Sequence, residues 1–462
     1  MSKARCQIRR LFVANRGEIA VRIVQACRVL GIESVVGVSD ADRDTMAARL
    51  ADRAVCIGPA RATESYLRKE AIVAAALGTG CDAVHPGYGF LSEQSEFRRF
   101  CDEHRLTFVG PSSDTIEELG DKLRARQIAE KLGLPIVPGS DNVNSPDDAR
   151  HFGERAGYPF LLKASAGGGG RGIRLVRSAE DVNAAFNSAS VEAWAAFGDA
   201  TLYIERYIER ARHIEVQVLG DGLGKVIHLG ERDCSTQRRH QKLIEEGPSP
   251  VLEEHDRVRM TTDAVRLAAH FQYEGAGTVE FILDLDTKNF YFLEMNTRIQ
   301  VEHPVTEMIT RRDLVAEMIR IAGGLPLSFS QGEVVTRGHA IECRINAEDF
   351  YSDFRPSPGK LTKWQIPTGP GIRVDSHCYA GYQVPPFYDS MIAKVIVLGN
   401  DRAEAIEKMK SALDDFVVEG VKTTIPFHQL ALCHPDFIGS QVTTQWVESV
   451  LLSTSTSSLD TS

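Results

Sequence analysis

The stretch Phe290-Tyr-Phe-Leu-Glu-Met-Asn-Thr-Arg-Ile-Gln-Val-Glu-His303 decides how the rest of the chain is interpreted. A period of two is typical of a β-strand, so we expect its even-numbered residues to share one face. That face turns from aromatic to polar halfway along, which predicts a strand that leaves a core and enters a site. The even positions are Phe290, Phe292, Glu294, Asn296, Arg298, Gln300 and Glu302.

Residues 278–284 predict a second strand just upstream, and residues 284–289 predict the turn between the two. Folding this hairpin places Glu280 opposite Glu294, with Asn296 two residues further along the same face. Like charges that face each other are destabilising unless something neutralises them. Two carboxylates and an amide suit Mg²⁺ or Mn²⁺, so we predict a metal site at Glu280, Glu294 and Asn296. The alternative is a solvated hairpin edge.

Length and composition describe a multidomain globular protein. The chain has 462 residues, of which 43% are hydrophobic and 25% are charged. No apolar run approaches the ~20 residues of a membrane span, and the net charge of −10 argues against a nucleic-acid surface. The nine cysteines show no C-x-x-C spacing, and residues 11–14 are too short an apolar run for a signal peptide. We therefore expect reduced thiols and a cytoplasmic location.

The order of predicted elements indicates the fold class. Between residues 10 and 119 apolar strands alternate with helices, which predicts a doubly wound parallel sheet. Sites in such sheets lie beyond the carboxyl ends of the strands, where the turns at residues 15–18 and 85–93 fall. Later strands predict an α+β unit with mixed and antiparallel sheet. We divide the chain into an N-terminal domain (1–119), a helical connector (120–137), a lid (138–207), a C-terminal domain (208–450) and a disordered tail (451–462).

The loop Ser165-Ala-Gly-Gly-Gly-Gly-Arg-Gly172 predicts a phosphate-binding lid. A Rossmann fingerprint or a P-loop would need a helix after the loop, whereas here predicted strands lie on both sides. A glycine-rich hairpin tip lets backbone N–H groups approach phosphates and lets the tip close over them. Lys163, just before the loop, favours an anionic ligand. A floppy surface hairpin is the alternative.

A basic cluster between strands of the last unit stands out in an acidic protein. It reads Glu231-Arg-Asp-Cys-Ser-Thr-Gln-Arg-Arg-His-Gln-Lys242. The local excess of hydrogen-bond donors predicts a site for a small anion, with solvated charge as the alternative.

Five motifs, in order and with matching spacing between about residues 10 and 450, together resemble biotin carboxylase. This family is the ATP-grasp component of acetyl-CoA carboxylase and related biotin-dependent carboxylases. The resemblance implies an N-terminal domain, an ATP-grasp lid and a C-terminal domain. The motifs are Asn15-Arg-Gly-Glu-Ile-Ala20, His85-Pro-Gly-Tyr-Gly-Phe-Leu-Ser-Glu93, Lys163-Ala-Ser-Ala-Gly-Gly-Gly-Gly-Arg-Gly172, Arg238-Arg-His-Gln-Lys242 and Glu294-Met-Asn-Thr-Arg-Ile-Gln-Val-Glu-His-Pro-Val-Thr-Glu307.

The resemblance implies a role for each matching residue. It assigns ATP to Lys122, Lys163, Gly169, Gly170, Glu205, Ile208, His213 and His240. It assigns two Mg²⁺ or Mn²⁺ ions to Glu280, Glu294 and Asn296, and bicarbonate to Lys242, Arg298, Gln300, Val301 and Glu302. It places biotin beside Tyr88, Glu93 and Arg344. The implied catalytic residues are Arg298, Glu302, Lys242 and Arg344, with Glu302 as the base and Arg344 stabilising the biotin enolate.

The implied chemistry explains these residue types. Bicarbonate attacks the γ-phosphorus of ATP to give carboxyphosphate, which breaks down to CO₂ and phosphate, and the phosphate takes the ureido proton of biotin. Phosphoryl transfer depends on positioning and on charge neutralisation, which lysines and a carboxylate-bound metal provide. Three positions depart from the common pattern: Ala166 replaces a glycine, Arg206 a lysine, and Gln445 a histidine found in some members.

Two other functions would share part of the pattern. A different ATP-grasp carboxylate–amine ligase would keep the lid and the metal site but not the motifs 238–242 and 298–302. A catalytically silent nucleotide-binding subunit would tolerate substitutions that this chain does not show. Lys408-Met-Lys410 lies in a helical pattern rather than at a hairpin tip, so we expect biotin on a separate carrier protein, with a carboxyltransferase as a further partner. The family also implies a homodimer, for which the sequence names no interface.

Overall fold

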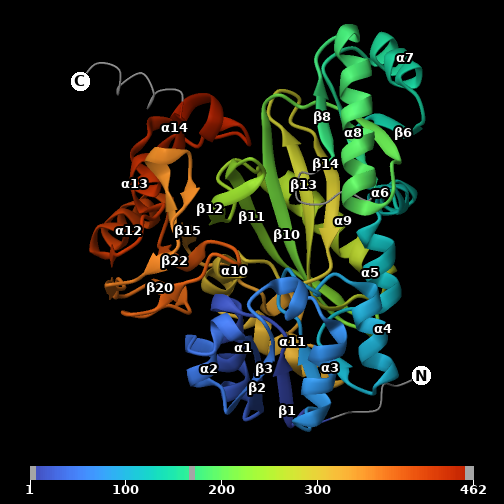
Figure 1. Cartoon of the computed structure of the whole chain (residues 1–462). Coiled ribbons are helices and arrows are strands. Elements are labelled where there is room, and N and C mark those ends of the chain that lie inside the picture. Colours follow the sequence, from blue (N-terminus) through green and yellow to red (C-terminus); the bar gives the residue numbers. More distant parts are fainter. Residues whose placement is uncertain (1–6, 166–171, 453–462) are drawn as a thin grey trace.

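The computed structural model describes residues 7–165 and 172–452. Its N-terminal part contains a five-stranded parallel sheet (Figure 1). The strand order is β3-β2-β1-β4-β5, and every pair is parallel. Leu11 and Val13 enter one core cluster and Phe12 another, so both faces of the sheet are covered. The strands are β1 (Arg10–Val13), β2 (Glu33–Ser39), β3 (Arg53–Gly58), β4 (Ala83–His85) and β5 (Thr107–Phe108), and the helices are α1 (Gly17–Leu30), α2 (Met46–Leu50), α3 (Lys69–Gly78) and α4 (Ser95–Glu103).

The turns after β1 and β4 meet at the carboxyl edge of this sheet. The Asn15 side-chain amide donates hydrogen bonds to the carbonyl oxygens of Pro86 (2.6 Å) and Tyr88 (2.7 Å). The sheet reverses its direction of winding between these two strands, which is where open α/β sheets place their sites. The predicted doubly wound sheet and the position of its site-facing turns are confirmed.

The lid is a four-stranded antiparallel sheet in the order β6-β9-β7-β8. Strands β7 and β8 pair with Lys163 opposite Ile173, so the glycine-rich segment joins a hairpin as predicted. Gly169 and Gly170 belong to residues 166–171, which lie outside the described residues. The elements are β6 (Gly139–Val143), α7 (Pro146–Ala156), β7 (Phe160–Ala164), β8 (Ile173–Val176), α8 (Val182–Phe197) and β9 (Leu202–Arg206), preceded by α5 (Ser113–Gly120) and α6 (Lys122–Lys131).

The C-terminal part is built on an eight-stranded antiparallel sheet in the order β14-β13-β10-β11-β12-β15-β22-β20 (Figure 1). Its strands are β10 (Ala211–Asp221), β11 (Val226–Arg238), β12 (Gln241–Gly247), β13 (Glu274–Asp284), β14 (Phe290–Asn296), β15 (His339–Asn346), β20 (Ile372–Ser376) and β22 (Met391–Gly399). The larger helices are α9 (Glu254–His270), α10 (His303–Thr310), α11 (Leu314–Ala322), α12 (Arg402–Asp415), α13 (Ile425–Cys433) and α14 (Pro435–Ile438). Three small sheets use β16 (Glu348–Asp349), β17 (Arg355–Pro356), β18 (Gly359–Lys360), β19 (Lys363–Gln365), β21 (Gln383–Val384) and β23 (Val417–Glu419).

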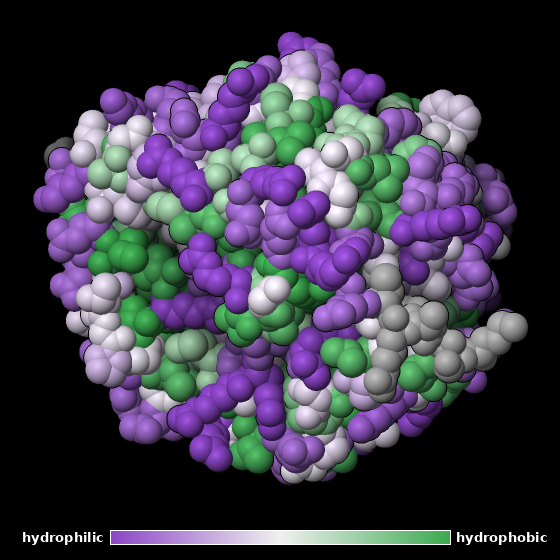
Figure 2. Space-filling model, turned by 90° about the horizontal axis from the view of Figure 1, so that it is seen from below, coloured by the Kyte–Doolittle hydropathy of each residue, from purple (hydrophilic) through white to green (hydrophobic). Residues whose placement is uncertain are grey.

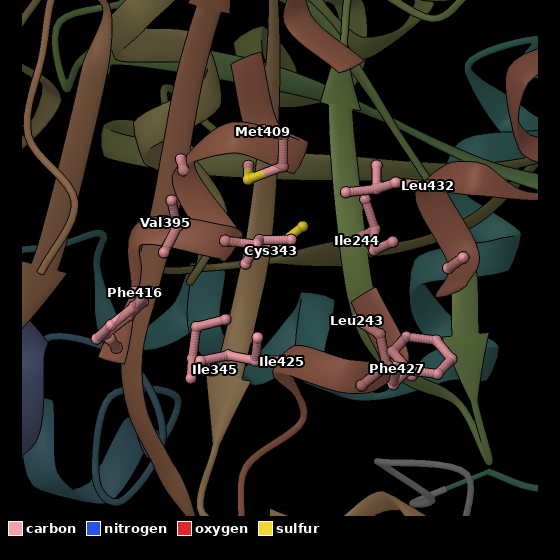
Figure 3. Packing of buried hydrophobic residues seen from close by; sticks show 14 of the residues in the cluster. Leu243, Ile244, Cys343, Ile345, Val395, Met409, Phe416, Ile425, Phe427 and Leu432 are labelled. Carbon is pink, nitrogen blue, oxygen red and sulfur yellow. The ribbon is translucent and has the colours of Figure 1, made fainter. Parts of the chain in front are cut away.

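The largest core cluster covers one face of this sheet at β12, β15 and β22. Figure 3 shows Cys343 of β15, Val395 of β22 and Met409 of α12 within the same packed group. Because neighbouring residues of a strand point to opposite faces, Arg344 and Lys394 lie on the other face. In β15 and β22, residues of one face therefore pack in the core, while Arg344 and Lys394 on the other face contact Glu302 and the Val301 carbonyl, respectively.

Two predictions about local structure are wrong. Phe292 lies opposite Phe281 and Glu294 opposite Glu280, so Leu293 is an extra residue that forms a β-bulge. The bulge puts Phe290 and Phe292 in the same core cluster as Met295, and the even-numbered residues do not share one face. The basic segment 231–242 does not lie between strands either, because it forms most of the β11–β12 hairpin.

The end of the described chain is also ordered further than predicted. Leu451, where the sequence analysis began a disordered tail, is 1% exposed in the last helical turn (Val447–Leu451), and residues 453–462 lie outside the described residues. On the face shown in Figure 2, hydrophobic residues occur in small groups separated by hydrophilic ones. Within residues 7–165 and 172–452, none of the helices combines the length and apolar character that crossing a membrane requires.

Candidate active site

The centre of the candidate site is Lys242, whose ammonium group lies among three carboxylates. Its Nζ is 2.6 Å from Glu215, 3.0 Å from Glu280 and 2.6 Å from Glu302. These residues come from β12, β10, β13 and the start of α10, so four separate elements meet here. Burial by itself lowers the pKa of Lys242, but the three carboxylates outweigh burial and raise this pKa well above its ordinary value. Lys242 therefore stays protonated.

Glu302 is held between two cations. One side-chain oxygen accepts from Lys242, and the other accepts from the Arg344 guanidinium at 2.9 Å. Arg344 is oriented in turn by Glu245, 2.6 Å from its Nε. Burial opposes ionisation of Glu302, but Lys242 and Arg344 hold its pKa well below the ordinary range. Glu302 is thus a fully buried, ionised carboxylate between two cations.

The carboxylates of the hairpin face each other as predicted, because Glu280 and Glu294 are register partners. Glu294 accepts from Lys122 at 2.7 Å, and the second oxygen of Glu280 lies 3.0 Å from His213 Nε2. The first oxygen of Glu280 accepts from the Asn296 side-chain amide at 2.9 Å. Two carboxylates and an amide oxygen within one hairpin match the donor set that Mg²⁺ and Mn²⁺ prefer.

Arg298 connects this hairpin to the N-terminal sheet. Its Nε lies 2.9 Å from Glu93, in the segment that follows β4. Its two terminal nitrogens donate to Gln300 (2.8 Å) and to the Asn296 side-chain oxygen (3.0 Å). The planar guanidinium is therefore fixed on three sides and suits recognition of a planar anion.

Four of the residues that the family resemblance assigns to ATP fall into two groups. Lys163 of β7 pairs with Glu205 of β9, which also lies 3.3 Å from Arg126. Lys122 and His213 lie against the hairpin carboxylates, as described above. Ile208 follows β9 without belonging to a strand, and His240 is exposed at the β11–β12 tip with a left-handed φ of 64°. The structure thus brings Lys122 and His213 to the hairpin but leaves His240 on the surface.

Two of the three departures from the family pattern, Arg206 and Gln445, have a partner in the structure. Arg206 lies 3.2 Å from Asp284 and over the ring of Tyr291. The Gln445 side-chain amide donates to the Tyr207 hydroxyl. Ala166 lies outside the described residues.

Sequence reasoning missed two charged residues at the site, Glu215 and Lys394. Glu215 is the register partner of Glu280 and contacts Lys242, and Arg232 lies 2.6 Å from Glu215 in the protein interior. Lys394 is fully buried and reaches the Val301 carbonyl. Both had a signal in the sequence: Glu215 shares its strand alternation with His213, and Lys394 is a lone charge in an otherwise apolar strand.

Comparison with known families covers most of the chain. Residues 7–116 match the family described as biotin carboxylase, N-terminal domain, and residues 342–449 match the biotin carboxylase C-terminal domain. Residues 121–330 between them match the carbamoyl-phosphate synthase L chain, ATP binding domain.

Individual relatives agree with these matches. The chain is 52% identical over 442 residues to Biotin carboxylase 1 of Bacillus subtilis, covering 96% of this chain and 98% of that protein. A biotin carboxylase–β-γ-ATP complex from Campylobacter jejuni has a TM-score of 0.93 and 48% identity, covering 96% of this chain and 98% of that one. The biotin carboxylase domain dimer of Hydrogenobacter thermophilus 2-oxoglutarate carboxylase, in complex with MgADP, ADP and bicarbonate, has a TM-score of 0.91 and 46% identity, covering 96% and 97%. This chain therefore belongs to the biotin carboxylase family of ATP-dependent ligases.

Proposed function

We propose that this chain carboxylates biotin, using ATP and bicarbonate, on a biotin group that a separate carrier protein presents. The observation that carries the proposal is the position of Glu302. It is a buried carboxylate between Lys242 and Arg344, and Lys242 also contacts the hairpin carboxylate Glu280. Lys242 is thus shared by the candidate base Glu302, the candidate metal ligand Glu280 and the candidate anion site.

On the nucleotide side, Lys122, Lys163 and His213 would contact ATP, and Glu205 with the segment through Ile208 would hold its base and ribose. The H. thermophilus domain, described as a complex with MgADP, supports this assignment. Glu280, Glu294 and Asn296 would hold Mg²⁺ or Mn²⁺, with two ions expected. A divalent ion at these residues supplies charge neutralisation for the nucleotide phosphates. His240 would also contact the nucleotide, with Gly169 and Gly170 closing over its phosphates.

On the bicarbonate side, Arg298, Gln300, Val301 and Lys242 would hold the anion, and Glu302 would take its proton. The bicarbonate oxygen then attacks the γ-phosphorus, and the bond to ADP breaks to leave carboxyphosphate. Carboxyphosphate divides into CO₂ and phosphate, and the phosphate removes the ureido proton of biotin. Arg344 would stabilise the enolate oxygen while the nitrogen attacks CO₂, and Tyr88 and Glu93 would line the biotin side. Fixed dipoles and charges of this kind lower the barrier because they need no reorganisation.

The proposal includes partners that the chain itself does not contain. A biotin carboxyl carrier protein would present the biotin and a carboxyltransferase would use the product. We propose acetyl-CoA or another acyl-CoA as the final acceptor, consistent with a role in fatty acid biosynthesis, and a cytoplasmic location. A homodimer is supported by the dimer named for the H. thermophilus domain. Mass spectrometry of protein from biotin-fed cells should show no biotinylated lysine, and a modified lysine would refute the separate carrier.

The reaction is tested by phosphate release from ATP. We expect turnover that requires bicarbonate and rises with free biotin, and we expect Glu302→Gln to lower it by ~100-fold or more because the base is lost. Glu317→Gln is the control, since Glu317 is also buried but contacts Ser328 and Arg320. Turnover without bicarbonate would indicate another ATP-grasp ligase, and the absence of turnover would indicate a silent nucleotide-binding subunit.

A further inference from the structure

Lys394 is a fully buried lysine in the middle of β22. Its side chain is 0% exposed, and its strand neighbours Ala393 and Val395 belong to the largest core cluster. Burying an ammonium group costs several kcal/mol unless it is paired and hydrogen-bonded. The lysine is therefore compensated by specific contacts, and those contacts indicate what it does.

The first contact is with the main chain of the proposed bicarbonate segment. Lys394 Nζ donates to the carbonyl oxygen of Val301 at 2.6 Å. This carbonyl belongs to the peptide group that joins Val301 to Glu302. Because a peptide group is planar and rigid, fixing its oxygen also fixes the amide of Glu302 and the starting point of the Glu302 side chain.

The second contact is with the N-terminal part of the molecule. Lys394 Nζ lies 3.0 Å from Glu18, the second residue of α1. The same oxygen of Glu18 accepts the hydroxyl hydrogen of Tyr88, from the turn that follows β4. One ammonium group thus connects the carboxyl edge of the parallel sheet to the segment that carries Glu302.

The register of the C-terminal sheet explains the placement. Lys394 is the direct partner of Arg344 across the β15–β22 ladder, so the two side chains are neighbours on one face. Arg344 binds the carboxylate of Glu302, and Lys394 binds the peptide group that precedes it. Glu302 is consequently held at its side chain by Arg344 and at its main chain by Lys394.

We propose that Lys394 is a positioning residue, which holds the Val301–Glu302 peptide group so that the Glu302 carboxylate meets bicarbonate. It touches neither nucleotide nor metal in this proposal. The inference rests on the proposed biotin carboxylase reaction, in which Glu302 is the base.

The experiment compares Lys394→Met, which keeps the chain length but removes the charge and the donor, with the wild-type chain. We expect kcat/KM for bicarbonate to fall about 10- to 100-fold, while KM for ATP changes less than about two-fold, because only the bicarbonate segment loses its anchor. Lys394→Arg, which keeps the charge and the donor groups, is expected to recover part of the loss.

Lys408→Met is the matched control. Lys408 Nζ donates to the carbonyl oxygen of Leu398, a residue of β22, at 2.6 Å, and Lys408 contacts none of the described residues of the proposed site. We expect this variant to retain the wild-type kcat/KM for bicarbonate. A general effect of removing a lysine–carbonyl hydrogen bond would instead appear in both variants and would overturn the proposal.

Removing only the lysine leaves Glu18 buried without its cation, so the single variant can fail to fold. The double variant Lys394→Met, Glu18→Gln removes both charges and keeps an acceptor for Tyr88. The same selective loss for bicarbonate is expected in it. An unchanged kcat/KM for bicarbonate in a folded variant, or an equal loss of kcat/KM for bicarbonate and for ATP, overturns the role of Lys394. Wild-type turnover that does not depend on bicarbonate refutes the proposed function itself.

Discussion

At the scale of one residue, Glu246 shows how strongly buried partners control a carboxylate. Burial opposes its ionisation, but His339 at 2.8 Å and Arg402 at 2.6 Å outweigh burial and lower its pKa from 4.5 to about 2. A lowered pKa stabilises the folded state fully above pH 4.5, and this stabilisation is lost as the pH falls towards 2. We predict that Glu246→Gln costs roughly 3 kcal/mol at pH 7 and progressively less below pH 4.5.

Thermal unfolding midpoints of wild type and Glu246→Gln, recorded from pH 7 down to pH 3, check this prediction. Glu407→Gln serves as the control because Glu407 is an exposed residue of α12 that pairs with Lys410. If the unfolding midpoints of wild type and Glu246→Gln differ as much at pH 3 as at pH 7, the stabilisation does not come from the lowered pKa of Glu246.

At the scale of one element, β14 depends on its bulge. Phe292 lies in the core beside Phe281, whereas the extra residue Leu293 is only half-buried. We predict that Phe292→Ala lowers the free energy of unfolding by about 3–5 kcal/mol, the usual cost of truncating a buried aromatic ring. Leu293→Ala, one residue along the same strand, is expected to cost clearly less. Urea denaturation of both variants measures the difference, and equal losses would show that Leu293 packs as a core residue.

At the scale of the whole molecule, Glu307 holds three segments together. It lies 2.9 Å from Arg22 of α1 and 2.8 Å from Arg373 of β20, while Glu307 itself belongs to α10. Removing one member of a buried ion pair leaves an uncompensated charge and costs about 3–5 kcal/mol. We predict a loss near 3 kcal/mol for Glu307→Gln, because Asp313 and Asp375 still pair with the two arginines.

Hydrogen exchange tests whether the lost stability comes from contacts between the N-terminal part, which contains α1, and the C-terminal sheet, which contains β20. In Glu307→Gln, amides of α1 and β20 should exchange faster than in wild type, while those of the lid should not change. Glu407→Gln again serves as the surface control. Faster exchange that is confined to α10 would mean that Glu307 stabilises its own helix and does not join the sheets.

Much of the site could be predicted from the sequence because it depends on short-range patterns. Folding the predicted hairpin placed Glu280 opposite Glu294, and the alternation of strands and helices was enough to predict the parallel sheet. The hairpin pairing is right only because of the bulge: continued regularly, the ladder that pairs Leu283 with Phe290 would put Leu293 opposite Glu280. The bulge itself could not be predicted, because it adds a residue without any composition that marks it. The domain boundaries at 119, 137 and 207 and the roles of the individual site residues stay predictions.

The class of each sheet, the glycine-rich hairpin and the family of the protein follow from the amino-acid order, because periodicity and motifs are properties of neighbouring residues. Which charges compensate one another follows only from the packing of the folded chain. Lys242 meets Glu215, Glu280 and Glu302, and Lys394 meets Glu18 and the Val301 carbonyl, over separations of tens to hundreds of residues. The physical reason is that a buried charge is stable only beside its partners, and the chain brings those partners together only when its sheets pack.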